Sequence, residues 1–424
     1  AADNGGVIFK PLVGLHPNVA EIDFFSMYPH IMTTWNISAE TVGVSGKHTR
    51  WAPGIGTAIN QDHSGIVAEI LKPILAKRQA LKDILEGQVD KQGYDLDYVK
   101  TAYEFLKGLG WVSYGYQGFS GNRIGSIEAH EAINAVSRDV ILHAKEAAEE
   151  AGFEVLHLYV DSLFASIGAH EARLPDLLAE IKQRTGLKID LEGILRWIAF
   201  LPSKQNPLVP VPNCYFGVFR DGELKCRGIM ARRGDSPPFI AEVQMEAIRV
   251  LASEPDFDKL PNLIPKLVRL FQHNYRILQG NEVELPRLVI SQTLSRNLED
   301  FTVLSAAARA ASQLAKDRTT LRAGQTIDFV RVKEPPYALS LHSIEAEKHM
   351  EIDTAWYAEQ LLRAADEVLY SLGVPREVLR GWLFGKPGYW TPEDYVNKTP
   401  AELPLLAQIA KYSPEKNRIR AIAK

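Results

Sequence analysis

The chain has 424 residues, of which 46% are hydrophobic and 24% are charged. At the usual ~150 residues per domain, this length predicts about three domains. The composition is that of a folded globular chain and excludes a wholly disordered or fibrous protein. A net charge of -4 gives no sign of a nucleic-acid partner, so any anionic ligand has to be held by a local basic patch.

Cys214 and Cys226 are the two cysteines of the chain. Two cysteines exclude a disulfide scaffold and a four-cysteine zinc site, and we expect both to be reduced core residues. No apolar run reaches the ~18 residues of a membrane-spanning helix. The chain begins with neither Met nor a leader-like segment, and we therefore expect a piece of a longer protein or a processed product.

The first half of the chain predicts both strands and long helices. Strands are expected at 7–9 and 19–25, with a helix after Pro29. An apolar stripe predicts a helix over 65–86, and a second helix over about 96–109 completes a helical hairpin. A period near 3.6 predicts a helix over 126–150, and the β-branched and aromatic run at 153–167 predicts two strands meeting at a turn around Asp161 and Ser162.

In the second half, residues 201–212 carry four prolines and read as a linker or rim loop. An Asp-Gly turn then predicts a hairpin over 213–230. From residue 240 the pattern is mostly helical, with helices over 240–252, 258–279, 302–316 and 353–372. A compositional boundary falls near 232, and the basic residues of 411–424 could contact DNA, dock a partner or simply be solvated.

Two carboxylates stand at the ends of apolar strands, Asp23 in EIDFFSMYP and Asp161 in HLYVDSLF. An Asp among apolar neighbours is costly unless it is paired, hydrogen-bonded or bound to a metal. Two converging Asp side chains would repel each other until a divalent cation neutralised them. The alternative is two unrelated turn aspartates.

Three basic residues form a second candidate group. Arg78 and Lys82 lie four apart on one helix face, and Lys107 lies on the next helix of the hairpin. They could grip a polyphosphate, or they could belong to a solvated face. The sequence contains no GxxxxGK[ST], GxGxxG, HExxH or GxSxG motif, which argues against a P-loop, a dinucleotide fold and the commonest hydrolases.

Three ordered segments resemble the motifs of family B DNA polymerases. DFFSMYPHIMTTWNIS resembles the DFxSLYPSI block, KGLGWVSYGYQGF resembles the KxxxNSxYG motif of the fingers, and LYVDSLFASI resembles the YxDTDS hairpin. The segments GGVIFKPLVGL, RGIMARR and IDTAWYAEQLL are similar to archaeal-type members in the same order, so the resemblance covers nearly the whole chain.

The resemblance implies an α+β fold, the polymerase right hand with an antiparallel palm sheet, helical-hairpin fingers and a mostly helical thumb. The palm would comprise 1–48 and 121–232, the fingers 49–120 and the thumb 233–424. The implied activity is template-directed transfer of deoxynucleotides (dNTPs) to a primer 3′-hydroxyl. The implied cofactor is a pair of Mg²⁺ ions, with Mn²⁺ as a substitute, and the implied partners are primer-template DNA and dNTPs.

The resemblance also implies roles for individual residues. Asp23, Asp161 and the backbone carbonyl of Phe24 would hold the metal ions, and both carboxylates would be catalytic. Tyr28 would stack beneath the incoming sugar and reject a ribose 2′-hydroxyl, and Tyr114 would flank the nascent base pair. The full set implied to bind the nucleotide is Ser26, Met27, Tyr28, Arg78, Lys82, Lys107 and Tyr114, and the set implied to bind DNA is Tyr215, Arg232 and Arg233.

The sequence departs from the family pattern in three places. The first Asp of the DTD hairpin is Tyr159, although the gapless match of DSLFASI keeps Asp161 on the second Asp; a shifted register would instead predict an impaired site. The Asn-Ser pair of the fingers motif is Trp111 and Val112, where the indole either reshapes the pocket or packs in the core. Asn213 replaces the lysine of the KxY element, which predicts weaker phosphate anchoring there.

Only 22 residues precede Asp23, so we expect this chain to lack the proofreading exonuclease of the family, which a separate chain carrying the N-terminal and exonuclease domains could supply. We expect no membrane partner and, from the family and the lack of targeting signals alone, the nucleoid of a prokaryotic cytoplasm. The alternative functions are a catalytically weakened relic that binds primer-template DNA or acts in assembly, and a template-independent transferase.

Overall fold

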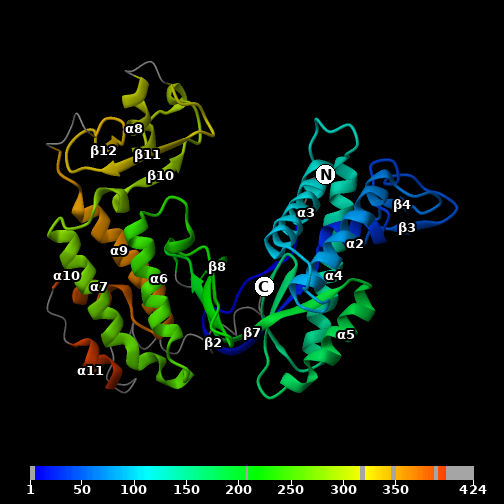
Figure 1. The fold of residues 1–424 in the computed structure, drawn as a ribbon, viewed down its shortest axis with the longest axis horizontal. Coiled ribbons are helices and arrows are strands. Elements are labelled where there is room, and N and C mark those ends of the chain that lie inside the picture. Colours follow the sequence, from blue (N-terminus) through cyan, green and yellow to red (C-terminus); the bar gives the residue numbers. More distant parts are fainter. Residues whose placement is uncertain (1–4, 207–208, 316–319, 345–349, 386–389, 398–424) are drawn as a thin grey trace. The chain divides into compact units, whose positions relative to one another are not determined.

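The structure is a computed structural model that describes residues 5–206, 209–315, 320–344, 350–385 and 390–397. The chain divides into two compact units (Figure 1). The first unit comprises residues 1–11 and 18–194, and the second comprises residues 12–17 and 195–424. Strands β2 (Gly14–Phe24) and β7 (Ile189–Pro202) each have residues in both units.

The first unit combines an antiparallel sheet with helices. Four of its strands follow the order β1-β5-β6-β2, and every neighbouring pair is antiparallel. Asp23, near the end of β2, is paired with Ser162, the first residue of β6. Besides β2 and β7, its elements are β1 (Ile8–Phe9), α1 (Met27–Thr34), β3 (Thr49–Trp51), β4 (Ala58–Asn60), α2 (Ile66–Leu85), α3 (Leu96–Gln117), α4 (Ile127–Glu150), β5 (Glu154–Tyr159), β6 (Ser162–Ser166) and α5 (Leu174–Thr185).

Helices α2 and α3 form the hairpin that the sequence predicts, and they contact each other along their length (Figure 1). Asp95 caps α3 by accepting hydrogen bonds from two backbone N–H groups. The helix continues well beyond the predicted end near 109, through two further glycines. One of them, Gly110, faces Pro29 so closely that an added Cβ would lie 3.0 Å from the Pro29 ring, so the close approach of α3 to α1 requires a small residue.

The helix predicted after Pro29 is present, but α1 begins three residues earlier than expected, at Met27. Proline is tolerated in the first turn of a helix, where its missing N–H would have no intrahelical partner. The two strands and the turn near Asp161 are confirmed, but the turn is Val160-Asp161 and Ser162 already belongs to β6.

The second unit contains the β7-β8-β9 end of the seven-stranded sheet β1-β5-β6-β2-β7-β8-β9, a further sheet and a helical core. Strands β7, β8 and β9 are antiparallel neighbours, and β10, β11 and β12 form a separate antiparallel sheet. Besides β7, its elements are β8 (Pro210–Phe219), β9 (Leu224–Arg227), α6 (Pro238–Ala252), α7 (Ile264–Gln279), β10 (Ile290–Thr293), α8 (Ala306–Ala315), β11 (Thr326–Arg331), β12 (Ala338–Ser340), α9 (Thr354–Leu369), α10 (Arg376–Phe384) and α11 (Pro392–Asn397).

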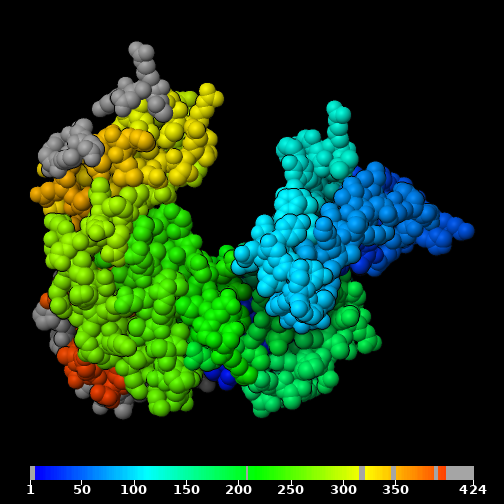
Figure 2. All heavy atoms as spheres, viewed as in Figure 1, coloured from blue at the N-terminus to red at the C-terminus, as the bar shows by residue number. Residues whose placement is uncertain are grey.

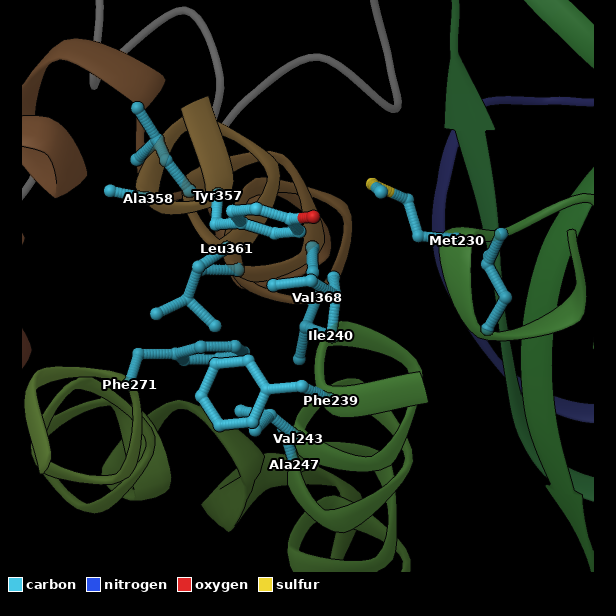
Figure 3. Packing of buried hydrophobic residues seen from close by; sticks show 14 of the residues in the cluster. Met230, Phe239, Ile240, Val243, Ala247, Phe271, Tyr357, Ala358, Leu361 and Val368 are labelled. Carbon is cyan, nitrogen blue, oxygen red and sulfur yellow. The ribbon is translucent and has the colours of Figure 1, made fainter. Parts of the chain in front are cut away.

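The core of the second unit lies between α6, α7 and α9 (Figure 3). Phe239 of α6, Phe271 of α7 and Leu361 of α9 are labelled there, and all three side chains are buried. Burial of large apolar side chains is the main favourable term in folding, so this packing stabilises the unit.

The α+β class and the antiparallel sheet are confirmed. The linker over 201–212 is wrong in part, because β7 extends to Pro202 and β8 begins at Pro210. The sheet β10-β11-β12 was not predicted, and its strands lie between the predicted helices in a region expected to be mostly helical. Both cysteines are free thiols, as expected. The palm, fingers and thumb boundaries stay a prediction, and the basic residues of 411–424 lie outside the described residues.

Among the helices that the structure describes, none combines the length and the apolar content that crossing a bilayer requires.

Candidate active site

Asp23 and Asp161 are brought together by the sheet of the first unit. Asp161 lies at the tip of the β5–β6 hairpin, and its backbone carbonyl accepts a hydrogen bond of 3.1 Å from the Phe24 N–H. The Ser162 hydroxyl donates to the Asp23 carboxylate at 3.2 Å. The two carboxylates therefore come from neighbouring strand ends, and both residues are half-buried.

The electrostatics of this pair favour a cation. Burial raises the pKa of Asp23, and the negative charge of Asp161 raises that pKa further. Burial also raises the pKa of Asp161, although the Lys107 ammonium offsets part of the effect. A pair of carboxylates that disfavour each other's ionisation in this way is stabilised in its charged form by a divalent cation.

The donor set fits a hard cation such as Mg²⁺. Within the described parts of the chain, no cluster of three or more His, Cys, Asp or Glu side chains is arranged to hold a metal ion. A cation here would depend on the two carboxylates, with the adjacent Phe24 carbonyl as a further oxygen donor. Mg²⁺ commonly binds to proteins through one or two carboxylates and completes its shell with water and substrate phosphates.

The backbone on both sides of this pair is unusual. Val160, the other residue of the hairpin tip, has a φ of 61°, and Ser26, which precedes α1, has a φ of 51°. Positive φ is rare for residues other than glycine and is a genuine outlier for a β-branched residue. Such backbone strain persists only where the surroundings impose it, and it clusters at functional sites.

Arg78 joins α2 to the loop before α1. Its guanidinium donates hydrogen bonds to the Ser26 hydroxyl and, at 2.9 Å, to the Tyr103 hydroxyl of α3. It also lies over the ring of Phe25, 4.4 Å from the centroid. The side chain is buried and interacts electrostatically with Asp23, so the charge of one predicted phosphate-binding residue acts on this carboxylate.

Two further cations surround the Phe25 ring. The ammonium groups of Lys82 and Lys188 lie 5.1 and 5.3 Å from its centroid. The Asp190 carboxylate lies 2.7 Å from the Lys82 ammonium and 3.8 Å from that of Lys188. With Arg78, three positive charges gather around one ring, and the carboxylates of Asp190 and Glu86 pair with Lys82. A cluster of cations of this kind can bind a polyanion.

Lys107 lies one helical turn after Tyr103 on α3, and its charge acts on Asp161. Its ammonium lies 5.4 Å from the Trp111 ring centroid. Trp111 is 65% exposed, which excludes the core-packing alternative for this residue. Figure 2 shows the hairpin that carries these residues at the surface of the first unit, in blue to cyan.

The two predicted tyrosines stack on each other. The rings of Tyr28 and Tyr114 are 4.2 Å apart with an interplanar angle of 10°. Met27, also predicted to bind nucleotide, has a buried side chain in the core of the first unit, so only its backbone could contact a ligand. Tyr159, which replaces the first Asp of the family hairpin, is paired with Ile8 and Ser162 at the end of β5.

The residues predicted to bind DNA belong to the second unit. Tyr215 is buried, and its ring lies edge-on against Phe200. Arg232 and Arg233 are exposed, and Arg233 donates two hydrogen bonds of 3.1 Å to Asp235. Their role as DNA contacts stays a prediction.

Sequence reasoning missed several residues of this site. Phe25, Lys188 and Asp190 were not singled out, and neither were His130 and Asn134, which contact Tyr114. A signal existed only for the last two, because they are polar residues on the apolar face of a predicted helix.

Comparisons with known proteins agree on one family. The family model described as DNA polymerase family B matches residues 2–167 and 205–372. DNA polymerase 2 of Aeropyrum pernix is 26% identical over 386 residues, which cover 89% of this chain and 46% of that protein. The DNA polymerase of Thermococcus sp. (strain 9oN-7) is 27% identical over 391 residues, which cover 89% of this chain and 48% of that protein.

The solved structure of the family B DNA polymerase from the hyperthermophilic archaeon Pyrobaculum calidifontis has a similar fold. Its TM-score is 0.60 at 23% sequence identity, and the match covers 88% of this chain and 48% of that one. The chain thus spans about half the length of the curated relatives that it matches.

Proposed function

Because the chain belongs to DNA polymerase family B, we propose that it catalyses template-directed addition of dNTPs to a primer 3′-hydroxyl, with its catalytic centre at Asp23 and Asp161. One observation carries the proposal. The half-buried carboxylate pair, the cations around Phe25 and the Tyr28–Tyr114 stack all lie in the first unit, and Arg78 and Lys107 act electrostatically on the two carboxylates.

Each group has a defined part in this reaction. Asp23 and Asp161, with the Phe24 carbonyl, would hold two Mg²⁺ ions. When bound, such ions lower the pKa of the attacking hydroxyl and stabilise charge on the attacking and leaving oxygens. Arg78, Lys82 and Lys107 bind the triphosphate and neutralise its charge, which aligns the transferred phosphorus with the primer end.

The tyrosines provide the surface for the nucleoside. The Tyr28 ring lies beneath the incoming sugar, where a 2′-hydroxyl would collide with it, and Tyr114 flanks the nascent base pair. Tyr215, Arg232 and Arg233 contact the primer-template. In this proposal the first unit contains the fingers and the catalytic part of the palm.

Primer extension tests the proposal. Wild-type protein is incubated with primer-template, Mg²⁺ and four dNTPs, and compared with Asp161→Asn, which removes one carboxylate charge at nearly constant shape. We expect the variant to lose activity by more than about 100-fold, since transition-state charge stabilisation is lost. Asp176→Asn is the matched control, because Asp176 is an exposed carboxylate in the first turn of α5.

The possible outcomes separate the alternatives. Wild-type extension no greater than that of Asp161→Asn would refute the polymerase proposal and leave the catalytically weakened relic. Extension of a single-stranded primer without template would instead indicate the transferase. Whether the chain lacks its own exonuclease stays a prediction.

A further inference from the structure

Helix α4 carries a polar stripe on its buried face. His130, Asn134 and Ser137 are spaced four and three residues apart, which places them on one side of the helix. Asn134 is fully buried and Ser137 is 1% exposed. The rest of this face is apolar, with Ile133, Val136 and several alanines in the core. Burying polar side chains is costly unless they are hydrogen-bonded, so the partners of this stripe explain its presence.

The main partner is Tyr114, one of the two tyrosines of the nucleotide site. The Tyr114 hydroxyl donates to Asn134 Oδ1 at 2.9 Å and lies 3.3 Å from His130 Nε2. The His130 ring also stacks against the Tyr114 ring, with centroids 4.5 Å apart. The Tyr28 ring stacks on the Tyr114 ring, with centroids 4.2 Å apart, and the Ser137 hydroxyl donates a hydrogen bond of 3.0 Å to the Asn134 carbonyl.

The result is a layered stack of three rings, of which His130 belongs to α4 and Tyr114 is hydrogen-bonded to it. Tyr28, Tyr114 and His130 follow one another in the stack, and Asn134 fixes the hydroxyl of the middle ring. An added Cβ on Gly6 would lie 3.2 Å from the Tyr28 hydroxyl, so the Gly6 backbone is close to the polar end of this ring. The ring face is covered by Tyr114.

We propose that His130 and Asn134 are positioning residues for sugar selection: they hold Tyr114, and through it the Tyr28 ring, at the place where a ribose 2′-hydroxyl would collide. The inference rests on the proposed function, because it assigns the deoxynucleotide preference of that same site. A ring rejects a 2′-hydroxyl only if it cannot move aside, so rigidity of the stack is what selectivity requires.

Single-nucleotide insertion tests the inference. The ratio of kcat/KM for a dNTP to kcat/KM for the ribonucleotide of the same base is measured for the wild type, Asn134→Ala and Tyr114→Phe. Tyr114→Phe removes the hydroxyl that contacts both Asn134 and His130, so it tests the link between the tyrosine and α4 if Asn134→Ala folds poorly. Leu142→Ala, an exposed site on the same helix, is the matched control.

We expect both variants to lower the ratio about tenfold, mainly because ribonucleotide insertion rises. In Asn134→Ala, kcat for the dNTP should fall less than about threefold. Asn134→Asp keeps an acceptor oxygen and should restore most of the ratio. A buried stripe that serves stability alone would lower the melting temperature of Asn134→Ala and leave the ratio of the folded protein unchanged.

The failure of this inference differs from the failure of the proposed function. If the wild type inserts dNTPs selectively and both variants keep its ratio, the positioning role is refuted and the polymerase proposal stands. If the wild type inserts neither nucleotide, the polymerase proposal fails. Binding of dNTP and ribonucleotide to a complex with a dideoxy-terminated primer, in which no chemistry occurs, then decides the positioning role: an unchanged affinity ratio in the variants refutes it.

Discussion

Replacing Asp190 by asparagine should tighten the binding of a dNTP about fivefold. The reason is the state of Lys82 in the absence of nucleotide. Its ammonium lies 2.7 Å from the Asp190 carboxylate and 3.4 Å from that of Glu86. Burial lowers the pKa of Lys82, but the hydrogen bonds and charges of these two carboxylates outweigh burial and raise it. A triphosphate must therefore compete with Asp190 for this cation.

The magnitude follows from the environment of the pair. Two unit charges 2.7 Å apart attract each other by ~6 kcal/mol at an effective dielectric constant of about 20. The side chains are 15% and 29% exposed, so desolvation and solvent screening cancel most of this, and a net value of about 1 kcal/mol is realistic for such a pair. In the variant, Lys82 keeps Glu86 as a partner and is not left as an unpaired charge.

The assay measures the dissociation constant of a dNTP on a complex with a dideoxy-terminated primer, where chemistry is blocked. The fivefold gain expected at low salt should shrink at high ionic strength, because salt screens partly exposed charges. Glu150→Gln is the matched control, since it removes one carboxylate from an exposed ion pair with Arg184 elsewhere in the first unit. It changes the net charge equally and should leave the dissociation constant unchanged.

Two results would refute this reasoning. Weaker dNTP binding by Asp190→Asn would mean that the carboxylate orients Lys82 for the phosphates and does not compete with them. An equal gain in Glu150→Gln would mean that overall charge, and not the local pair, sets the affinity.

Three further predictions concern the second unit. Burial raises the pKa of Cys214 to about 12, so its thiolate is scarce at pH 8 and alkylation of the native protein should be slow. The alkylation rate should rise tenfold per pH unit below that pKa and should be fast in denaturant. Rapid labelling of the native protein at pH 8 would contradict this prediction. Leu361 lies in the core shown in Figure 3, and Leu361→Ala should lower the free energy of unfolding by about 3 kcal/mol. Val303 is 77% exposed, and Val303→Ala should lower it by less than about 0.5 kcal/mol. Gly228 has a φ of 63°, and an added Cβ there would collide with a backbone carbonyl of β8. Gly222 also has a positive φ, but no atom lies within 4 Å of an added Cβ. Gly228→Ala should therefore lower the melting temperature more than Gly222→Ala.

Long helices were predictable because their apolar stripes are long. The pattern over 65–86 agrees with α2 to within a residue at each end, since one helix face supplies the period directly. The end of α3 was not predictable, because Gly110 reads as a helix breaker until the contact with Pro29 is known. Strands β10, β11 and β12 have only four, six and three residues, and such short segments are stabilised by cross-strand pairing that the local sequence does not show.

In the candidate site, too, some residues could be predicted from the sequence and others could not. The carboxylates and the cations of α2 and α3 lie within recognisable motifs, so their residues could be named from the sequence. The partners of those groups come from elsewhere in the chain: Asp190 immediately follows the first residue of β7, more than 100 positions after Lys82. No local pattern links two such residues, because their contact exists only in the folded sheet and hairpin.

Two cations of the candidate site are already paired within the protein, in keeping with the near-neutral net charge of the chain. Arg78 is held by two hydroxyl groups and Lys82 by two carboxylates, so each cation already has partners before a nucleotide arrives. Nucleotide affinity is then a difference between two sets of contacts, which makes it sensitive to residues that never touch the ligand. The stacking of Tyr28 on Tyr114 follows the same logic, because the proposed sugar selectivity depends on neighbours that limit the motion of Tyr28. Variants at Asp190 and Asn134 therefore change two separable quantities, the affinity for the triphosphate and the choice of sugar, and a double variant should combine the two effects additively if the two sets of contacts are independent.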